Sequence, residues 1–390
     1  MTEKQGLHRS VIALGFVSFF MDVSSEAIHS LLPLFMVNVL GLSALAVGLI
    51  DGGAESLKLF FKPLSGWLSD RFQHRKYLTA FGYGLAACTK PLFALAQGLP
   101  LIITARLLDR TGKGIRGAPR DALIADITPK PLRGRAYGLR QAMDTAGALV
   151  GPLLAALAMW WLHDNYRLVF WLAAIPAVLS VSTLLLFVRE PEHRKKSDNE
   201  NGDSTNSPSF SKTYWLVVAV ACAMALARPS EAFLLLRGQS VGLSESETPL
   251  LFAMMNIVYA ASVYPVGKWF DDIGPRRLLL ASMVILLAAM LVLRFADFSQ
   301  MIWLGAALWG LHLGSSQGIL AALISLHAPE LKRGTAFGLY ALLTGLALVA
   351  NGAIVGTLWQ QMSPAMAYNF AVVMSVLALL VCWQIKIGEK

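Results

Sequence analysis

Ionisable side chains lie inside segments of this sequence that are otherwise apolar. Within residues 11–37, a helical periodicity of 100° per residue places Asp22, Glu26 and His29 on one face. Burial disfavours the charged form of a carboxyl group and a nearby cation favours it, so such a group can exchange a proton for another ligand. We therefore take Asp22 and Glu26, with Glu55 of the next apolar segment, as the candidate proton-coupling residues.

The segment 101–126 carries the densest set of charges, and seven of them fall within an arc of roughly 140° on one helix face. Five of these side chains are cations and two are acids. Guanidinium and ammonium groups bind carboxylates and phosphates well, which favours an anionic or zwitterionic organic ligand. The candidate substrate-binding residues are Arg106, Asp109, Arg110, Lys113 and Arg116 of this segment, with Lys58, His29, Asp144 and Glu231 elsewhere.

The composition predicts a membrane protein made of helices. Apolar residues make up 56% of the 390 residues, and charged residues only 15%. Twelve apolar stretches are long enough to cross a hydrocarbon core of about 30 Å as helices. They cover approximately residues 11–37, 44–69, 77–97, 101–126, 136–161, 167–188, 214–237, 247–270, 277–296, 300–327, 335–360 and 365–387.

The net charge of +9 does not indicate nucleic-acid binding, because Lys and Arg are concentrated in alternate loops. This asymmetry predicts an integral multi-pass protein of the bacterial cytoplasmic (inner) membrane with both termini in the cytoplasm. The first apolar run is too long for a signal-peptide core and has no small-residue cleavage site, so we expect it to be retained as a membrane span.

Two sequence elements recur across the midpoint of the chain. Residues 66–76 have a degraded copy at 267–277, and residues 133–139 recur at 333–339 with an offset of 200. Such repetition is typical of transporters built from duplicated helical bundles. A polar, low-complexity stretch near the midpoint is predicted to be a linker, because it has too little apolar surface to fold. The expected organisation is an amino-terminal six-helix bundle over 1–188, a cytoplasmic linker over 189–213 and a carboxy-terminal six-helix bundle over 214–390.

The repeat also shows that the dense charge is confined to the first half. The fourth and tenth apolar segments align without gaps at the offset of 200, yet the second copy is almost uncharged. The charges are therefore not needed to hold this scaffold together. We assign the functions that need charged residues to the amino-terminal half. Arg106, Arg110, Arg116, Asp121, Asp126 and Asp144 correspond to Ala306, Gly310, Ser316, Ala321, Leu326 and Thr344.

The second half keeps a few polar candidates. Residues 25–27 match residues 230–232, which places Glu231 opposite Glu26 in the repeat, with Arg228 one turn before it. Arg228 and Glu231 are interpreted either as an i,i+3 pair within the seventh helix or as polar groups of a cavity. The uncharged candidates for the second wall of that cavity are Asn256, Tyr259, His312, Gln317, Tyr340 and Asn351.

With these motifs the chain resembles the major facilitator superfamily over essentially its whole length. Residues 66–76 are similar to that family's loop motif between helices 2 and 3, with Gln73 where Gly is usual. Residues 147–152 are similar to the antiporter motif of its drug-exporting branches, with Ala155 and Ala156 in place of the trailing glycines. The resemblance implies an all-α membrane protein with twelve transmembrane helices in two pseudo-symmetric six-helix bundles, in which helices 1, 4, 7 and 10 line a central cavity.

The resemblance also implies a gating role for the loop motif. In the family, an acid at the place of Asp126 pairs with basic residues of that motif, so Asp126 is expected near Arg71 or Arg75. Asp70 is expected at the amino-terminal end of helix 11 near Gly334, where free backbone N–H groups favour an anion.

Gly147 and Gly151 lie four residues apart, so they share a helix face where another backbone can approach closely. Pro152 removes a backbone donor next to them. We expect either a bendable packing seam with a role in gating or a plain small-residue helix contact. The candidate gating residues are Gly66, Asp70, Arg71, Arg75, Asp126, Gly147, Gly151 and Pro152.

Together these features favour a secondary active transporter that couples efflux of a small anionic or zwitterionic organic solute to proton entry by alternating access. The alternatives are an importer or uniporter of an anionic metabolite, or a non-transporting membrane receptor on the same fold. An enzyme is not expected, because the sequence has no metal-ligand cluster, nucleophile elbow or phosphate-binding loop. The expected partners are the solute, protons and the lipid bilayer, with no nucleic acid, no metal and no cofactor beyond the proton gradient, for a chain that works as a monomer.

Overall fold

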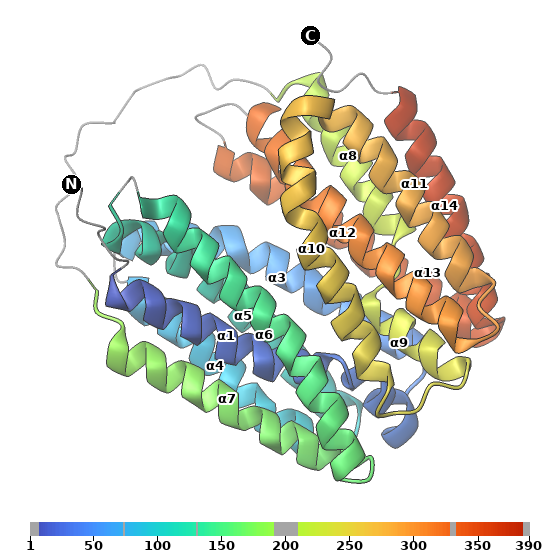
Figure 1. Ribbon diagram of the computed structural model, residues 1–390, viewed down its shortest axis with the longest axis horizontal. Helices are drawn as coiled ribbons and strands as arrows, with labels where there is room; N and C mark the ends of the chain where they lie inside the picture. Colours follow the sequence, from blue (N-terminus) through green and yellow to red (C-terminus); the bar gives the residue numbers. More distant parts are fainter. Residues whose placement is uncertain (1–7, 73–74, 130–131, 191–209, 328–332, 385–390) are drawn as a thin grey trace.

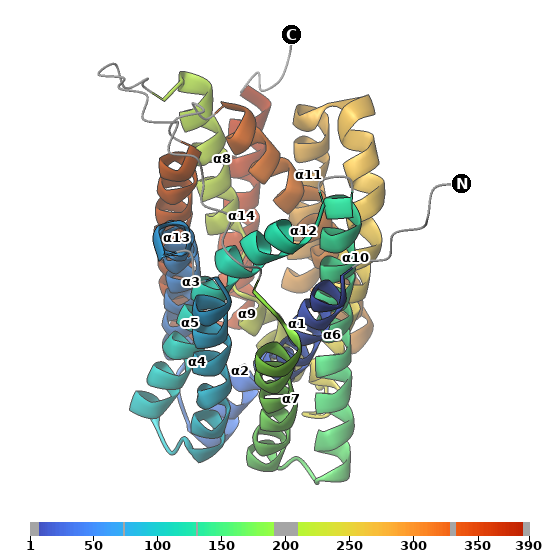
Figure 2. The ribbon, with the colours of Figure 1, turned by 90° about the vertical axis from the view of Figure 1, so that its left-hand side faces the viewer.

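A computed structural model describes residues 8–72, 75–129, 132–190, 210–327 and 333–384. This part of the chain is helical and contains no strand, and its helices form twelve segments that run across the molecule, as the sequence predicts (Figures 1 and 2). The segments are α1 (Arg9–His29) continued by α2 (Leu32–Leu34) and the π-helix η1 (Phe35–Val39), α3 (Ala44–Phe72), α4 (Arg75–Leu95), α5 (Leu99–Ile127), α6 (Arg133–Trp161), α7 (Tyr166–Phe187), α8 (Lys212–Ala227) followed by α9 (Glu231–Ser240), α10 (Thr248–Ile273), α11 (Pro275–Arg294), α12 (Ser299–His327), α13 (Arg333–Gln361) and α14 (Pro364–Gln384).

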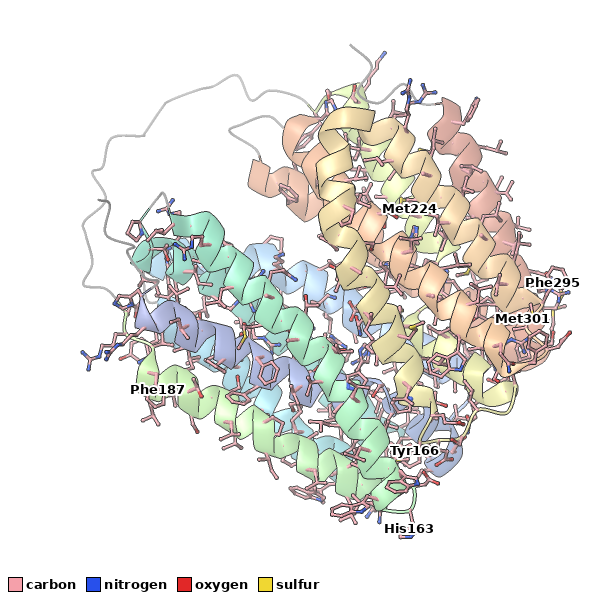
Figure 3. All side chains as sticks on the ribbon, viewed as in Figure 1. His163, Tyr166, Phe187, Met224, Phe295 and Met301 are labelled. Carbon is pink, nitrogen blue, oxygen red and sulfur yellow. The ribbon has the colours of Figure 1, made fainter. Side chains whose placement is uncertain are left out.

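The outer surface of the helices is apolar. Phe187 at the end of α7 and Phe295 after α11 both lie on this surface, as Figure 3 shows, and 65% and 58% of their area is exposed. Exposed aromatic and aliphatic side chains on this scale match a lipid environment rather than water. Seven of the described helical segments are long and apolar enough to cross a membrane: Arg9–Val39, Arg135–Trp161, Tyr166–Phe187, Lys212–Ser240, Arg276–Arg294, Thr335–Gln361 and Pro364–Trp383.

The helices are arranged in two groups, α1 to α7 and α8 to α14 (Figure 1). Within the first group α1 packs against α6 and α7, and α4 against α5; within the second group α11 packs against α12 and α14. The groups meet where α3 lies along α13 and where α6 lies along α10. These contacts pair the second helix of each group with the fifth helix of the other, as the internal repeat requires.

The two groups touch on the side of the molecule away from the chain termini and near mid-depth, and they diverge towards the termini (Figure 1). The hydrogen bonds that the described residues form between the groups follow this pattern. They join Asn38 to Glu245 (2.8 Å), the Leu45 N–H to Gln360 (3.5 Å), Ser56 to the Gly345 carbonyl (2.6 Å), Ser230 to Asp51, and Asn256 to the Ala148 carbonyl (3.4 Å).

Glycines allow α3 and α13 to approach very closely at this contact. A Cβ atom added to Gly48 would lie 2.2 Å from the Gly352 carbonyl oxygen, and one added to Gly52 would lie 2.7 Å from the Leu348 oxygen. Backbones can approach to this distance only where side chains are missing. The seam between α3 and α13 therefore closes the molecule on the side away from the termini.

Replacing Gly48 by valine is expected to open this seam, because the new side chain would overlap the α13 backbone. A single cysteine at cavity position Asn256, in a background with Cys88, Cys222 and Cys382 replaced by serine, should then react several-fold faster with an impermeant maleimide applied from the side away from the termini. Labelling of intact cells and of everted vesicles separates the two sides.

The matched control for this experiment is Gly53→Val, because a Cβ atom added to Gly53 has nothing within 4 Å. Gly53→Val carries the same change in helix propensity and should label like the parent protein. Equal labelling of the Gly48→Val and Gly53→Val variants would contradict the assignment of this seam as the closed side.

Candidate functional site

A cavity of about 290 Å³ lies between the two groups of helices. Its walls come from α1, α3, α5 and α6 on one side and from the α8–α9 junction, α10, α12 and α13 on the other. Its charged lining contains four carboxylates and four cations, so the wall is balanced in charge when His29 is neutral. They are Glu26, Asp51, Glu55 and Glu231 on the acidic side, and Lys58, Arg110, Lys113 and Arg228 on the basic side.

The cations of α5 are matched by acids that α1 and α3 supply. Lys113 lies between two carboxylates of α1, with Nζ 3.3 Å from Glu26 Oε1 and 4.0 Å from Asp22 Oδ1. Arg116 approaches Asp22 at 3.6 Å and stacks over the Tyr83 ring, 4.5 Å from its centroid. The excess of cations on one helix face is therefore compensated once the neighbouring helices are in place.

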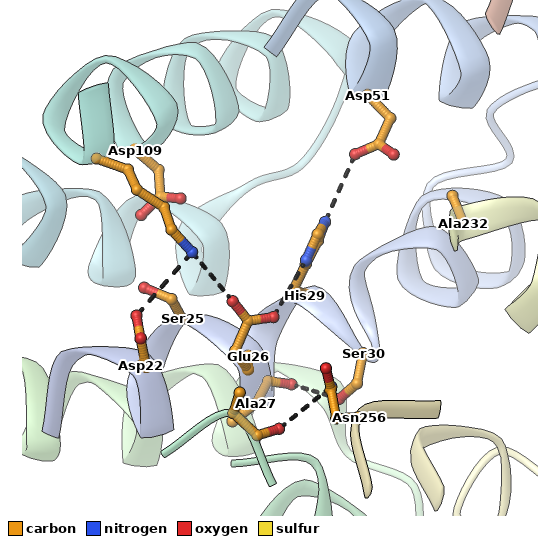
Figure 4. A network of polar contacts seen from close by, with 12 residues as sticks. Asp22, Ser25, Glu26, Ala27, His29, Ser30, Asp51, Asp109, Ala232 and Asn256 are labelled. Atoms are coloured by element: carbon orange, nitrogen blue, oxygen red, sulfur yellow. Dashed lines mark hydrogen bonds and ion pairs between the residues drawn. The ribbon is translucent and has the colours of Figure 1, made fainter. Parts of the chain in front are cut away.

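His29 stands at the centre of the network. Its Nδ1 is 3.4 Å from Glu26 Oε2 and its Nε2 is 3.6 Å from Asp51 Oδ1, so the ring bridges a carboxylate of its own helix and one of α3 (Figure 4). Arg106 reaches from α5 to the same Asp51 carboxylate and to the His29 ring. Because Ser230 also donates to Asp51, this carboxylate links the amino-terminal network to the carboxy-terminal group of helices.

Glu55 is held by two cations. Lys58, one turn further along α3, donates to Glu55 Oε2, and Arg110 Nε lies 3.3 Å from Glu55 Oε1. The side chain of Arg110 is almost fully buried, with 2% of its area exposed. Each carboxylate oxygen of Glu55 therefore has its own cation.

Lys90 belongs to this network, although it is not among the site residues predicted from the sequence. Its Nζ lies 2.7 Å from Asp109 Oδ1 and donates to the Ser25 hydroxyl at 3.0 Å, and 1% of the lysine side chain is exposed. The sequence feature that indicates it is a lysine within the apolar segment 77–97, because an ionisable side chain inside the membrane is energetically unfavourable unless it is paired. Asp51 lies on the same helix as Glu55 and Lys58, but its link to Ser230 depends on the second half of the chain.

A second charged cluster lies nearer the side of the termini. Asp144 of α6 forms an i,i+4 pair with Arg140 at 2.5 Å, and Arg120 of α5 lies 3.6 Å from the same carboxylate. Arg120 also donates to the hydroxyls of Ser18 (2.9 Å) and Tyr83 (3.4 Å). Asp144, predicted as a substrate contact, is paired between α5 and α6 and is not among the residues that line the cavity, so that role stays a prediction.

The predicted site residues fall into two layers. The first layer lines the cavity, and the second lies outside the lining and is held by ion pairs between helices. Glu26, His29, Glu55, Lys58, Arg110, Lys113 and Glu231 are in the first layer, whereas Asp22, Arg106, Asp109, Arg116 and Asp144 are in the second. Among the uncharged candidates, Asn256, Tyr259 and Asn351 line the cavity, His312 is buried against Ser282, and the side chain of Gln317 lies outside the described part.

The contact expected for Asp126 is present. Arg75 Nη1 lies 2.8 Å from Asp126 Oδ2, which ties the start of α4 to the end of α5. Glu190, directly after α7, accepts hydrogen bonds from the backbone N–H groups of Arg75 (2.6 Å) and Lys76 (3.2 Å). A carboxylate at the first free N–H groups of a helix is favourable, so three helix ends are joined here.

Other residues of the predicted gate behave differently. Arg71 lies over the Trp67 ring, 5.4 Å from its centroid, and an added Cβ at Gly66 would meet Ala118 at 3.4 Å. The expected contact of Asp70 with the start of α13 near Gly334 falls on side chains outside the described residues.

Gly147 and Gly151 form the close seam that their spacing predicts. A Cβ atom added to Gly147 would lie 2.6 Å from the Phe19 carbonyl oxygen, and one added to Gly151 would lie 2.7 Å from the Val23 oxygen. Pro152 lies within α6, next to this contact. The seam brings α6 onto the helix that carries Asp22 and Glu26, so bending of α6 would act on those side chains.

The seventh predicted span, 214–237, is not one continuous helix. α8 ends at Ala227 and α9 begins at Glu231, so Arg228 and Glu231 are not an i,i+3 pair on a helix face. The pairing interpretation is wrong because Pro229 has no N–H group and interrupts the helix between them. Both side chains instead line the cavity, which was the other interpretation.

Comparison with known proteins identifies the fold that carries this cavity. The family model described as Major Facilitator Superfamily matches residues 14–235 and 219–388. The chain belongs to the major facilitator superfamily. Among its relatives, it is 30% identical over 380 residues to an MFS-type transporter of Methanocaldococcus jannaschii, covering 95% of this chain and 94% of that protein.

Two further proteins show the range of this family. Multidrug resistance protein 1 of Bacillus subtilis is 25% identical over 245 residues, which cover 61% of the chain and 62% of that protein. A crystal structure of the nucleoside transporter NupG, in a mutant form, superimposes with a TM-score of 0.81 at 11% identity, covering 96% of this chain and 98% of that one. The fold is therefore that of a major facilitator transporter, a multi-pass membrane protein that handles small molecules.

Proposed function

We propose that this transporter is a secondary active exporter that moves a small organic solute out of the cell in exchange for protons. The observation that carries this proposal is the charged cavity between the two groups of helices, which the glycine seam of α3 and α13 closes on one side. A binding site between two halves that can rock against each other is the arrangement used for alternating access.

The direction of loading follows from the distribution of loop charges. Lys and Arg concentrate on the side of the termini, which supports assigning that side to the cytoplasm of a bacterial cell. The two groups of helices diverge on that side, so the described conformation corresponds to an inward-facing state that would load solute from the cytoplasm (Figure 1).

Proton exchange is assigned to Glu26 and Asp22, with Glu55 as the third candidate. The geometry that supports this assignment is the sharing of Lys113 by the two α1 carboxylates at 3.3 and 4.0 Å. When one of these carboxylates is protonated, the Lys113 ammonium group would pair with the other, which is still charged. The position of Lys113 would therefore change with the protonation state of the pair. Glu55 ranks below them because Lys58 and Arg110 both hold it.

The solute is proposed to carry an anionic group, because Arg110 and Lys113 present cations to the cavity. Export is favoured over import by the similarity to Multidrug resistance protein 1 and by the antiporter-like segment 147–152. The cavity is complete within one chain, which supports a monomer as the working unit in the bilayer.

The competing function within transport is an importer or uniporter of an anionic metabolite. Everted membrane vesicles with a pH-sensitive dye test the difference, because respiration makes their interior acidic. Addition of an exported solute should release protons from the vesicles and raise the dye signal in proportion to solute uptake. A solute that enters without any proton release would exclude proton antiport and favour the uniporter.

A further inference from the structure

Arg228 and Glu231 are two opposite charges at the break between α8 and α9. Pro229 has no backbone N–H and disfavours helical backbone before it, so Arg228 takes an extended conformation with φ −109° and ψ 106°. Ser230 then caps the start of α9 by accepting a hydrogen bond from the Ala232 N–H. The break holds both charged side chains at the cavity wall.

The break is stabilised by its surroundings. It leaves the Leu226 carbonyl without its usual partner four residues on, and Asn351 of α13 donates a hydrogen bond to that carbonyl at 2.7 Å. On its other side, Ser230 donates to Asp51 of α3. Non-helical backbone at membrane depth is tolerated where it lines a cavity, and in transporters it forms binding sites.

The two charges at the break are not paired with each other or with their described neighbours. Among the described residues, Arg228 and Glu231 form no hydrogen bond and no ion pair within 4.0 Å, although they are only three residues apart. Glu26, which occupies the equivalent position in the repeat, is held by Lys113 at 3.3 Å and His29 at 3.4 Å. Charged groups that are partly withdrawn from water and unpaired are costly, so a ligand that satisfies them would bind favourably.

The repeat explains why Glu231 has no cation within 4.0 Å among the described residues. At the offset of 200, Lys113 corresponds to Leu313, and both residues line the cavity. The lysine that neutralises the first glutamate is therefore replaced by an apolar side chain beside the second. The ligand has to supply the missing ammonium group.

We propose that Arg228 and Glu231 bind the two charged ends of a zwitterionic solute, with its carboxylate on Arg228 and its ammonium group on Glu231. This inference rests on the proposed transport function and narrows its substrate class. Phe252 and Leu348 line the same cavity with Leu313 and provide a surface for an apolar body. The balanced charge of the cavity wall supports the same class, because a zwitterion adds no net charge to it.

The size of the cavity limits the solute. A volume of about 290 Å³ is at the lower end of the range for ligand pockets. A single amino acid or a molecule of similar size fits this description better than a large amphiphilic drug. We therefore expect a compact amino-acid-like solute with an aliphatic or aromatic side chain.

Binding to detergent-purified protein tests this assignment without any gradient or transport. The common L-amino acids are screened by their effect on the thermal unfolding temperature, since a ligand that binds the folded state raises it. L-Leucine and L-phenylalanine are compared with their N-acetyl derivatives, which lack the cation, and their methyl esters, which lack the anion. Each derivative is expected to bind about tenfold or more weakly than the parent, the loss of one charged hydrogen-bonded pair.

Two variants should each remove the preference for the unmodified amino acid over one of the two derivatives. Arg228→Gln should bind the methyl ester and the unmodified amino acid with equal affinity. Glu231→Gln should bind the N-acetyl derivative and the unmodified amino acid with equal affinity. Arg228→Lys keeps the charge and should retain part of the preference for a free carboxylate. Arg277→Gln and Glu247→Gln, at exposed positions outside the cavity, are the matched controls and should keep the parent pattern.

The outcomes separate this inference from the proposed function. No shift with any zwitterion of the panel, or equal binding of zwitterion, ester and N-acetyl derivative to the parent protein, would overturn the zwitterion assignment even if dye experiments show proton antiport. Unchanged selectivity in both Arg228→Gln and Glu231→Gln would overturn the roles of these residues. Selective binding without proton release in vesicles would leave the inference standing and reject the antiport mechanism.

Discussion

Replacing Lys90 by methionine is expected to lower the free energy of unfolding by about 3–5 kcal/mol, the usual cost of leaving one member of a buried ion pair without its partner. Asp109 would lose the ammonium group 2.7 Å away, deep between α4 and α5. Arg110 cannot take its place, since its Nε lies 3.9 Å from Asp109 and is shared with Glu55. The measurement is denaturant- and heat-induced unfolding of the purified protein in mild detergent.

The double variant Lys90→Met with Asp109→Leu should recover most of this loss, because replacing both members of a buried pair with apolar side chains is often close to neutral. Lys212→Met, at the exposed start of α8, is the matched control and should change stability by less than about 0.5 kcal/mol. If Lys90→Met were as stable as the parent, Asp109 would have to be neutral or hydrated, and the pair would not be a structural element of the first bundle.

The sequence predicts the fold well because its signals are local or repeated. Apolar length locates each span, and the copies at 66–76 and 267–277 define the duplication without any knowledge of contacts. The interruption at Pro229 was missed because hydropathy is continuous across it, and a proline alone does not decide between a kink and a break. Pro152 and Pro265 lie inside helices that continue past them.

The site is predicted less completely, because ion pairs between helices depend on rotation and depth. Periodicity places Asp22, Glu26 and His29 on one face of the helix. It does not show that Lys113 forms ion pairs with both of these acids. It also gives no means of pairing Lys90 with Asp109, which lies on another helix. For the same reason, α5 has an excess of cations when the sequence is read alone. The acids that pair with these cations are 50 to 90 residues away in the sequence.

Residues that line the cavity and residues that are paired behind it would take different parts in solute binding. Arg106 and Asp109 are paired behind the wall, so in this conformation they support the lining side chains and do not themselves line the cavity. The link from Asp51 to Ser230 crosses between the bundles, so in the proposed alternating-access cycle it would break when the closed side opens. A change of charge on the α1 carboxylates reaches this link through His29, which contacts both Glu26 and Asp51.

Replacing Glu26 by glutamine is expected to abolish solute accumulation driven by a pH gradient while leaving downhill exchange of solute measurable. The amide keeps the shape of the side chain but removes the charge that holds Lys113, so binding and release of a proton no longer change the site. Asp22→Asn should have the same effect through the same lysine. Radiolabelled solute in proteoliposomes, with and without an imposed gradient, separates accumulation from exchange.

Arg110→Gln provides the contrasting result, because it removes a cation from the cavity wall without removing a proton-exchanging group. The solute concentration for half-maximal transport should rise about tenfold, while transport still responds to pH. Glu55→Gln tests the third carboxylate, which Lys58 and Arg110 both contact in this conformation. Full gradient-driven accumulation in the Asp22→Asn, Glu26→Gln and Glu55→Gln variants would show that none of these carboxylates carries the exchanged proton. The coupling site would then have to be sought at Asp109 or Asp144, or the transporter would be a uniporter.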